Sequence, residues 1–148
     1  MKMRAPMPSL DGANWLNNKK MTAEMLAKRP TFIHFWSVSC DLCKYGLDTV
    51  SMLGDKYASE LNVIAVHMPR TEEDMILPNV KAVVEYYKMK HPIVVDNDFL
   101  ITDRFSNRYV PAYYLFDEKG QLRHYQAGGA ALRMLEKRIQ RVIEEYKR

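Results

Sequence analysis

The sequence has 148 residues and a formal net charge of +4, and 47% of its residues are hydrophobic while 27% are charged. This length is close to the commonest size of one domain, and the composition excludes a disordered or fibrous chain. No apolar run reaches the roughly 18 residues of a membrane span, and residues 1–12 lack the apolar region of a signal peptide. We therefore expect a single domain over residues 1–148, located in the cytoplasm, with no membrane partner.

The basic net charge does not by itself indicate nucleic-acid binding. Lys and Arg are scattered along the chain, and over residues 136–148 they alternate with acidic residues. Nucleic-acid-binding proteins usually concentrate their basic residues on one face. We therefore expect no nucleic-acid partner, and we expect a monomer.

Segments rich in β-branched and aromatic residues alternate along the chain with segments of helical periodicity. Residues 21–29 predict a short helix, with Thr22 as its cap. Residues 31–38 predict a strand buried on both faces, and a helix should follow it, with apolar residues on one face from Cys43 onward.

The second half of the chain continues this alternation. Further helices are predicted at 79–89, within 97–109 and at 132–146, and further strands at 61–68, 92–96, 112–117 and 121–127. Gly120 supplies the turn between the last two strands. The order β-α-β-α-β-α-β-β-α predicts an α/β fold with a central mixed sheet flanked by helices and a hairpin at one side.

Both cysteines of the chain lie in the segment FIHFWSVSCDLCK, directly after the predicted buried strand. A cysteine in the first turn of a helix is stabilised as thiolate by the exposed N–H groups and the helix dipole. Two intervening residues place a second thiol about one turn further on. This spacing predicts that Cys40 attacks a disulfide and that Cys43 resolves the resulting mixed disulfide.

The same segment resembles the FW-x-x-W-C-x-x-C-K motif of the thioredoxin-like superfamily. RYVPAYYLFDEKGQLRHYQAGG, residues 108–129, is similar to the second signature of that family, a Pro before a hairpin and a Gly after it. An extra strand and helix between residues 69 and 96 resemble the TlpA/ResA-like subgroup, and IHFWSVSC and AVHMPR resemble the cytosolic YkuV-type thiol-disulfide oxidoreductases of bacilli. The resemblance covers nearly the whole chain. It implies a thioredoxin-like fold with this strand-helix insertion and an N-terminal extension.

The resemblance also implies a substrate-binding site. Val110-Pro111 corresponds to the cis-proline loop that lies against the cysteines and binds substrate backbone in this family. The expected substrate-binding residues are Trp36, Asp41, Leu42, Val110 and Pro111. The implied partners are disulfide-bearing client proteins and a separate, unidentified reductase. No cofactor and no metal are expected.

Several positions depart from the family pattern. Ser39 replaces the Trp that precedes the nucleophile, Gly46 stands where ResA-type proteins have a glutamate, and Asp48 replaces the proline of the active-site helix. Asp41 follows Cys40 directly, and its negative charge disfavours a neighbouring thiolate. A dithiol that is less stabilised as an anion is more reducing, so these features favour a reductase over an oxidase.

His34 lies six residues before Cys40, where the family pattern has a buried acid that helps to move the proton of the resolving thiol. An imidazole has an ordinary pKa near 6.5, so a neutral His34 can accept the Cys43 proton, directly or through one water. The alternative is a core histidine held by a backbone carbonyl. His67, at the end of a predicted strand where functional residues of open α/β sheets gather, could face the site, but it is expected to be a loop histidine with a local hydrogen bond.

Other interpretations stay open. Cys40 and Cys43 could form half of a zinc site with His34 and His67, although structural zinc sites usually have a second close-spaced cysteine pair. They could also be inert buried thiols. Peroxiredoxins share the expected fold, but the positions of Pro and Thr in their Pro-x-x-x-Thr-x-x-Cys pattern are occupied here by other residues, Ile33 and Ser37.

Two functions from different classes therefore compete. In the first, the protein reduces or isomerises protein disulfides through a Cys40-Cys43 dithiol/disulfide cycle. In the second, the same pair switches the affinity of a binding module for a partner, without turnover.

His91, which precedes a proline, and His124, in the predicted hairpin, are expected on the surface.

Overall fold

The computed structural model describes residues 1–129 and 132–148, and its strands form one five-stranded sheet of order β3-β2-β1-β4-β5. The strands are β1 Thr31–Trp36, β2 Asn62–His67, β3 Ile93–Val95, β4 Ala112–Phe116 and β5 Leu122–Ala127. β1, β2 and β3 are parallel, whereas β4 is antiparallel to both β1 and β5. This arrangement confirms the predicted mixed sheet with a hairpin at one side.

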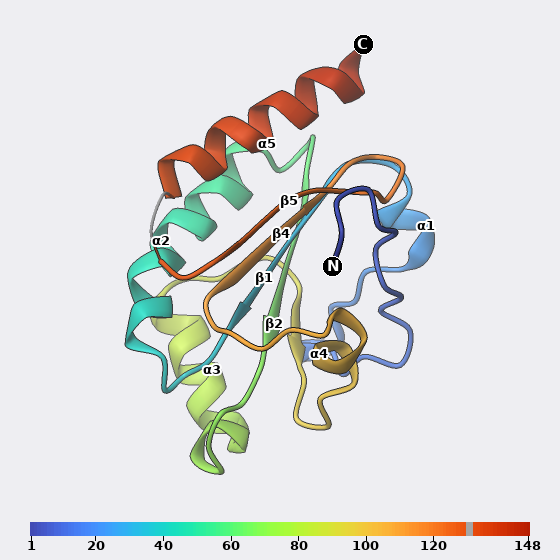
Figure 1. Ribbon diagram of the computed structural model, residues 1–148. Coiled ribbons are helices and arrows are strands. Elements are labelled where there is room, and N and C mark those ends of the chain that lie inside the picture. The colour runs from blue at the N-terminus through green and yellow to red at the C-terminus, as the bar shows by residue number, and fades with distance from the viewer. Residues whose placement is uncertain (130–131) are drawn as a thin grey trace.

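Helices cover both faces of the sheet (Figure 1). The helices are α1 Ala23–Leu26, α2 Asp41–Lys56, α3 Leu77–Tyr86, α4 Leu100–Phe105 and α5 Leu132–Lys147, and short 3₁₀ turns are η1 Leu16–Asn18 and η2 Glu73–Met75. α2, α3 and α5 lie on one face, and α1 and α4 lie on the other with the N-terminal segment. Each predicted strand and helix is present, with ends that differ by a few residues.

Local residue preferences explain where two of the helices begin. Thr22 caps α1 as predicted, and its side chain accepts a hydrogen bond from Met25 N at 3.2 Å. α3 begins two residues earlier than the predicted 79–89, at Leu77, because Pro78 fits the first turn of a helix without needing a hydrogen-bonded N–H.

β1 is the centre of the core and is buried on both faces, as its composition predicted. Alternate residues of a strand point to opposite faces. Phe35 packs with Ile101 and Phe105 of α4, whereas Phe32 packs with Leu53 of α2 on the other face. β1 is therefore held from both sides, and the segment that follows it starts from a fixed point.

The N-terminal segment contacts both edges of the sheet. Arg4 N donates to Leu122 O of β5 at 2.8 Å, and at the opposite edge Val95 N of β3 donates to Asn14 O at 2.8 Å. These bonds satisfy backbone groups that an open sheet edge would expose. In the described part of the chain, no helix is long and apolar enough to cross a membrane.

Candidate active site

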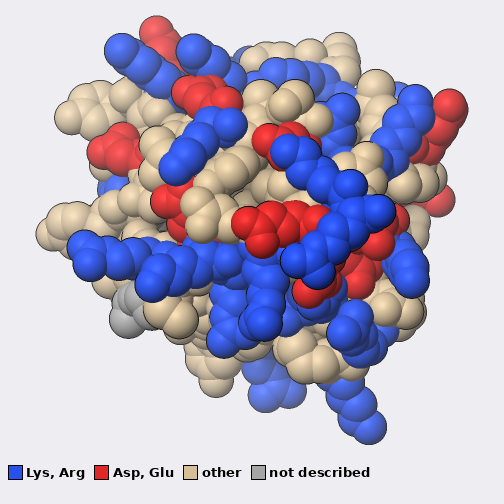
Figure 2. Space-filling view, turned by 90° about the horizontal axis from the view of Figure 1, so that it is seen from above, with Lys and Arg blue, Asp and Glu red and all other residues tan. Residues whose placement is uncertain are grey.

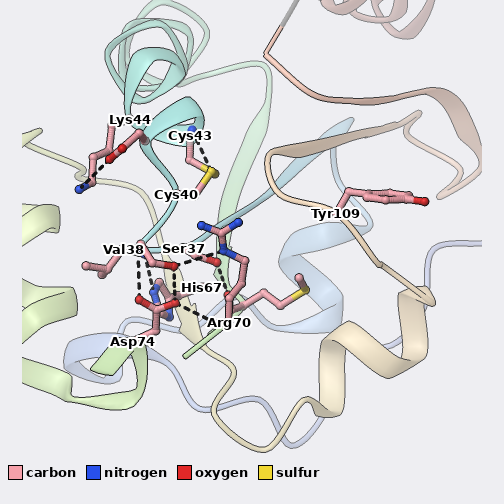
Figure 3. Close-up of a disulfide and its surroundings, with 12 residues drawn as sticks. Ser37, Val38, Cys40, Cys43, Lys44, His67, Arg70, Asp74 and Tyr109 are labelled. Carbon is pink, nitrogen blue, oxygen red and sulfur yellow. Dashed lines mark hydrogen bonds and ion pairs between the residues drawn. A yellow bond between two sulfur atoms is a disulfide. The ribbon is translucent and has the colours of Figure 1, made fainter. Parts of the chain in front are cut away.

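The two cysteines form a disulfide at the start of α2 (Figure 3). Cys40 is the N-cap of α2, and its Sγ accepts a hydrogen bond from Cys43 N at 3.0 Å. The two Cα atoms are 5.3 Å apart, and the residues are only 3% and 2% exposed. The helix N-terminus therefore directs an N–H group at the Cys40 sulfur, which is the geometry that stabilises a thiolate there after reduction.

The segment before Cys40 is held by the carboxylate of Asp74, from η2. Asp74 accepts hydrogen bonds from Ser39 N at 3.0 Å, from Ser39 Oγ at 2.8 Å and from Arg70 N at 2.9 Å. Burial alone would raise the pKa of Asp74, but the hydrogen bonds from Arg70 and Ser39 outweigh it and hold the pKa below its usual value. An ionised Asp74 thus ties the loop after β2 to the loop that carries the nucleophile.

His67, the last residue of β2, supports the same loop. Its Nε2 accepts a hydrogen bond from Val38 N at 3.1 Å, and its ring packs edge-on against Trp36 with centroids 4.8 Å apart. His67 is fully buried, and burial lowers its pKa to about 4, so the ring is neutral at neutral pH. The prediction of a loop histidine is wrong, because His67 ends a buried strand and bonds to a segment 29 residues earlier in the chain.

Arg70 brings a positive charge to the active site. Its Nε donates to Ser39 Oγ at 3.2 Å, and in Figure 3 its guanidinium points toward the disulfide. The side chain of Asp41, by contrast, is 92% exposed and pairs loosely with Lys44, 3.9 Å away. The sequence did not reveal Arg70 as a site residue, because a loop 30 residues beyond Cys40 delivers it.

The Val110-Pro111 peptide bond is cis, and this loop lies beside the cysteines. Val110 packs against the buried cluster that contains both cysteines and Trp36. Pro111 O accepts a hydrogen bond from Gly128 N at 2.8 Å, which links the loop to the end of β5. Tyr109, just before the loop, is 62% exposed and lies across from the disulfide in Figure 3.

Residues 3–125 match the AhpC/TSA family. The chain belongs to this family of thioredoxin-like proteins. It is 50% identical to thiol-disulfide oxidoreductase YkuV of Bacillus subtilis (strain 168), over 98% of this chain and 99% of the relative. Thiol-disulfide oxidoreductase ResA of Bacillus anthracis is 25% identical, over 72% of this chain and 60% of the relative.

A solved structure has the same fold. The solution structure of a thioredoxin-like protein in the oxidized form superposes with a TM-score of 0.88 at 51% sequence identity, over 98% of this chain and 99% of that chain. The chain is therefore a thiol-disulfide oxidoreductase with a CxxC pair, and the thioredoxin-like fold predicted from its two motifs is confirmed.

The predicted substrate-binding residues of this oxidoreductase separate into two groups. Asp41 and Leu42 are exposed, and a Cβ placed on Gly129 would come within 2.9 Å of the Leu42 side chain. Trp36, by contrast, is 1% exposed and packs behind the disulfide. The assignment of Trp36 to substrate binding is therefore corrected to a role in the core, because a side chain that is buried against the sheet cannot reach a client.

Packing explains why the enzyme has glycine where ResA-type proteins have glutamate. A Cβ on Gly46 would lie 2.7 Å from the hydroxyl oxygen of Tyr113, a buried residue of β4. Burial also raises the pKa of Tyr113 to about 12, so this hydroxyl stays neutral. The phenol of Tyr113 thus occupies the space into which a glutamate side chain at position 46 would extend.

His34 is hydrogen-bonded to another histidine and, among the described residues, to neither cysteine. Its Nε2 lies 3.0 Å from the Nε2 of His91. Burial, and then the neighbouring His91, lower the pKa of His34 well below its ordinary value, so His34 is a weak proton acceptor. This geometry favours the core role, with an imidazole in place of the expected backbone carbonyl. The prediction that His91 is a surface residue is only partly correct, because the residue is half-buried and its ring reaches inward to His34 of β1.

The residues of the alternative zinc site have other partners. His34 bonds to His91 and His67 bonds to Val38, while the cysteines bond to each other. Within residues 1–129 and 132–148, no three His, Cys, Asp or Glu side chains are grouped as metal ligands would be.

Proposed function

We propose that this enzyme reduces or isomerises protein disulfides in the cytosol through Cys40 and Cys43. The observation that carries the proposal is the disulfide at the start of α2, where Cys40 Sγ already accepts the Cys43 N–H. The adjacent cis Val110-Pro111 segment offers backbone groups beside the disulfide, which an extended client peptide can pair with as it would with a strand edge.

The cycle has two exchange steps. In the reduced enzyme, the Cys40 thiolate attacks one sulfur of a client disulfide and displaces the other sulfur as a thiolate, giving a mixed disulfide. The Cys43 thiolate then attacks Cys40 Sγ, the second client sulfur leaves, and the Cys40-Cys43 disulfide forms. Two electrons pass to the client. A separate dithiol reductant of the cell must then supply two electrons to reduce the Cys40-Cys43 disulfide again.

Trapping experiments test the division of roles between the cysteines. We expect Cys43→Ser to accumulate clients bound through Cys40, because attack still occurs while resolution cannot. Cys40→Ser should trap few clients, since it is the Cys40 sulfur, and not that of Cys43, that accepts the stabilising N–H at the start of α2. Equal trapping by both variants would contradict these roles.

A redox-switched binding module is the second candidate, and an insulin-reduction assay distinguishes it from the enzyme. A reductase turns over insulin disulfides in the presence of dithiothreitol, whereas a switch does not accelerate their reduction above the rate with dithiothreitol alone. A peroxidase is less favoured. Ser37, at the Thr position of the peroxiredoxin pattern, is fully buried, and its hydroxyl donates to Met68 O, so it does not face a peroxide.

The direction of electron flow depends on the reduction potential of the Cys40-Cys43 pair. The Asp41 carboxylate is solvated, so its effect on the neighbouring thiolate is screened and smaller than the sequence suggested. Equilibration of the enzyme with glutathione redox buffers measures the potential. A potential close to that of thioredoxin, about −270 mV, supports reduction of clients in the cytosol, and one near −120 mV supports oxidation.

We further propose that the enzyme acts as a cytosolic monomer on protein clients, without nucleic acid. On the face seen from above in Figure 2, Lys and Arg are widely spread and Asp and Glu lie among them, which does not favour a nucleic-acid surface. Cell fractionation and analytical ultracentrifugation test the location and the oligomeric state.

A further inference from the structure

A groove of about 520 Å³ lies between residues 19–29, the second half of α2 and the segment before β3. This volume is within the range of small-molecule sites. Neither cysteine is among its lining residues, so the groove is separate from the thiol site.

The rim of the groove is basic. Its cationic lining residues are Lys19, Lys28, Arg29 and Lys90, and Asp55 is the one carboxylate among the described lining residues. Lys19 Nζ donates to Lys90 O, and Arg29 donates to Ala58 O at 2.9 Å, so two of these cations are held against the backbone. Four positive charges facing one negative charge give the groove a potential that attracts anions.

The walls of the groove are largely apolar. Met21, Met25, Leu61, Val63 and Pro92 contribute to them. A cationic rim above apolar walls suits a ligand with an anionic headgroup and an apolar body. The headgroup can pair with the lysines and the arginine, and the apolar body can pack against the walls.

His91 connects the groove to the interior of the protein. Its Nε2 bonds to His34, and a Cβ built on Gly54 would lie 3.8 Å from its Nδ1, so that nitrogen faces α2 at a position without a side chain. Among the described residues, Nδ1 has no hydrogen-bond partner. Burial, and then the charge of Lys19, lower the pKa of His91 to about 4 against the opposing effect of Asp55, so the ring is neutral and carries one N–H at neutral pH.

We propose that this groove binds a small organic anion with an apolar body, and that His91 Nδ1–H donates to its headgroup. The hydrogen bond between the two histidines holds a single proton, on one Nε2 or the other. When His91 carries its proton on Nδ1, its Nε2 must accept from His34 Nε2–H. Binding of the anion therefore fixes the tautomers of both rings. The site lies beyond the thiol-disulfide chemistry, since its ligand contacts neither cysteine.

Titration calorimetry with three probes tests the ligand class. Octyl phosphate and octanoate share the proposed chemistry, and octanol lacks the charge. We expect at least one of the two anions to bind at least tenfold more tightly than octanol. The preferred anion identifies the headgroup as phosphate or carboxylate. If neither anion binds, or octanol binds as tightly as they do, the proposal is wrong.

Charge variants locate the site. The double variant Lys28→Gln, Lys90→Gln should weaken binding of the preferred anion by roughly tenfold or more, because each cation contributes a charge-assisted interaction. The matched control Arg133→Gln, Lys137→Gln makes the same change of net charge on the exposed side of α5 and should change binding less than twofold. Equal effects of the two double variants would show non-specific attraction and overturn the proposal.

Nuclear magnetic resonance of the imidazole nitrogens tests the role of His91 without a substitution that could unfold the protein. At saturation with the preferred anion, the proton of His91 should reside on Nδ1 and that of His34 on Nε2. If both rings keep their ligand-free signals while the anion binds, His91 is not part of the site and the proposal fails.

Discussion

At the scale of single residues, two charges of opposite sign act on the nucleophile from very different environments. Asp41 is solvated, whereas Arg70 is bonded to Ser39 and directed at the disulfide. A cation beside a thiolate stabilises it. We therefore expect Arg70→Gln to slow alkylation of Cys40 in the reduced enzyme at neutral pH by roughly threefold to tenfold.

The controls for this prediction separate charge from packing. Arg70→Lys keeps the charge and should recover most of the alkylation rate, while Arg141→Gln removes an exposed charge of α5 and should have no effect. A rate that falls equally in the Lys and Gln variants would attribute the effect to the lost hydrogen bond with Ser39 instead.

The pairing of His34 with His91 leads to a second residue-scale prediction. Because the pKa of His34 is lowered and its Nε2 is engaged, we expect His34→Asn to resolve a preformed mixed disulfide on Cys40 at the wild-type rate. Single-turnover measurements between about pH 6 and pH 9 test this, a range that spans the ordinary pKa of histidine. Slower release in the variant near neutral pH would instead make His34 the acceptor of the Cys43 proton.

The site residues that the sequence makes recognisable are those whose signal is local. Cys40 and Cys43 are recognised by their spacing and by the strand before them. Arg70, Asp74 and His91 act through contacts with residues far away in the chain, and nothing in their immediate sequence distinguishes them from surface residues. Their roles required the arrangement of the loops in space.

At the scale of secondary-structure elements, the contact between α2 and β4 depends on the absence of a side chain. A Cβ on Gly46 would meet the Tyr113 hydroxyl at 2.7 Å. We expect Gly46→Ala to destabilise the enzyme by about 1–2 kcal/mol, because overpacking outweighs the gain of up to about 1 kcal/mol in helix propensity. Urea unfolding measures this change.

A double-mutant cycle checks the cause. Tyr113→Phe removes the hydroxyl, so Gly46→Ala should be neutral or stabilising in that background, where only the helix propensity remains. If Gly46→Ala costs the same in both backgrounds, the contact with the hydroxyl is not the reason for the glycine.

The elements themselves were predictable because each carries a clear pattern. β1 consists of β-branched and aromatic residues apart from His34, and the buried residues of α5, Leu135, Ile139, Val142 and Ile143, recur at helical spacing. The ends of elements were less predictable, since they depend on contacts from elsewhere. β1 ends at Trp36, and the next residue, Ser37, uses its hydroxyl to bond Met68 O after β2.

At the scale of the whole molecule, the enzyme buries neutral histidines, and this links its stability to pH. Burial lowers the pKa of His67 and of His91 to about 4, whereas in the unfolded chain both titrate near 6.5. Between these values the unfolded state binds more protons than the folded state. Their contribution to stability is therefore complete above pH 6.5 and is lost as the pH falls toward 4.

We expect the free energy of unfolding to fall by about 1.4 kcal/mol per pH unit for each of these two histidines between pH 6.5 and pH 4, and to change little between pH 6.5 and pH 7.5. His34, whose pKa burial also lowers, adds to the fall below pH 6.5. Asp74 acts in a lower pH window, since its pKa is below the usual carboxyl value and its contribution is lost only as the pH falls through that pKa.

Urea unfolding at several pH values measures how steeply the free energy of unfolding changes with pH. His67→Gln can still accept from Val38 N and should remove one histidine's share of it, about 1.4 kcal/mol per unit. An unchanged slope in that variant would mean that the acid sensitivity arises from other groups, because a glutamine cannot take up the proton that His67 binds on unfolding.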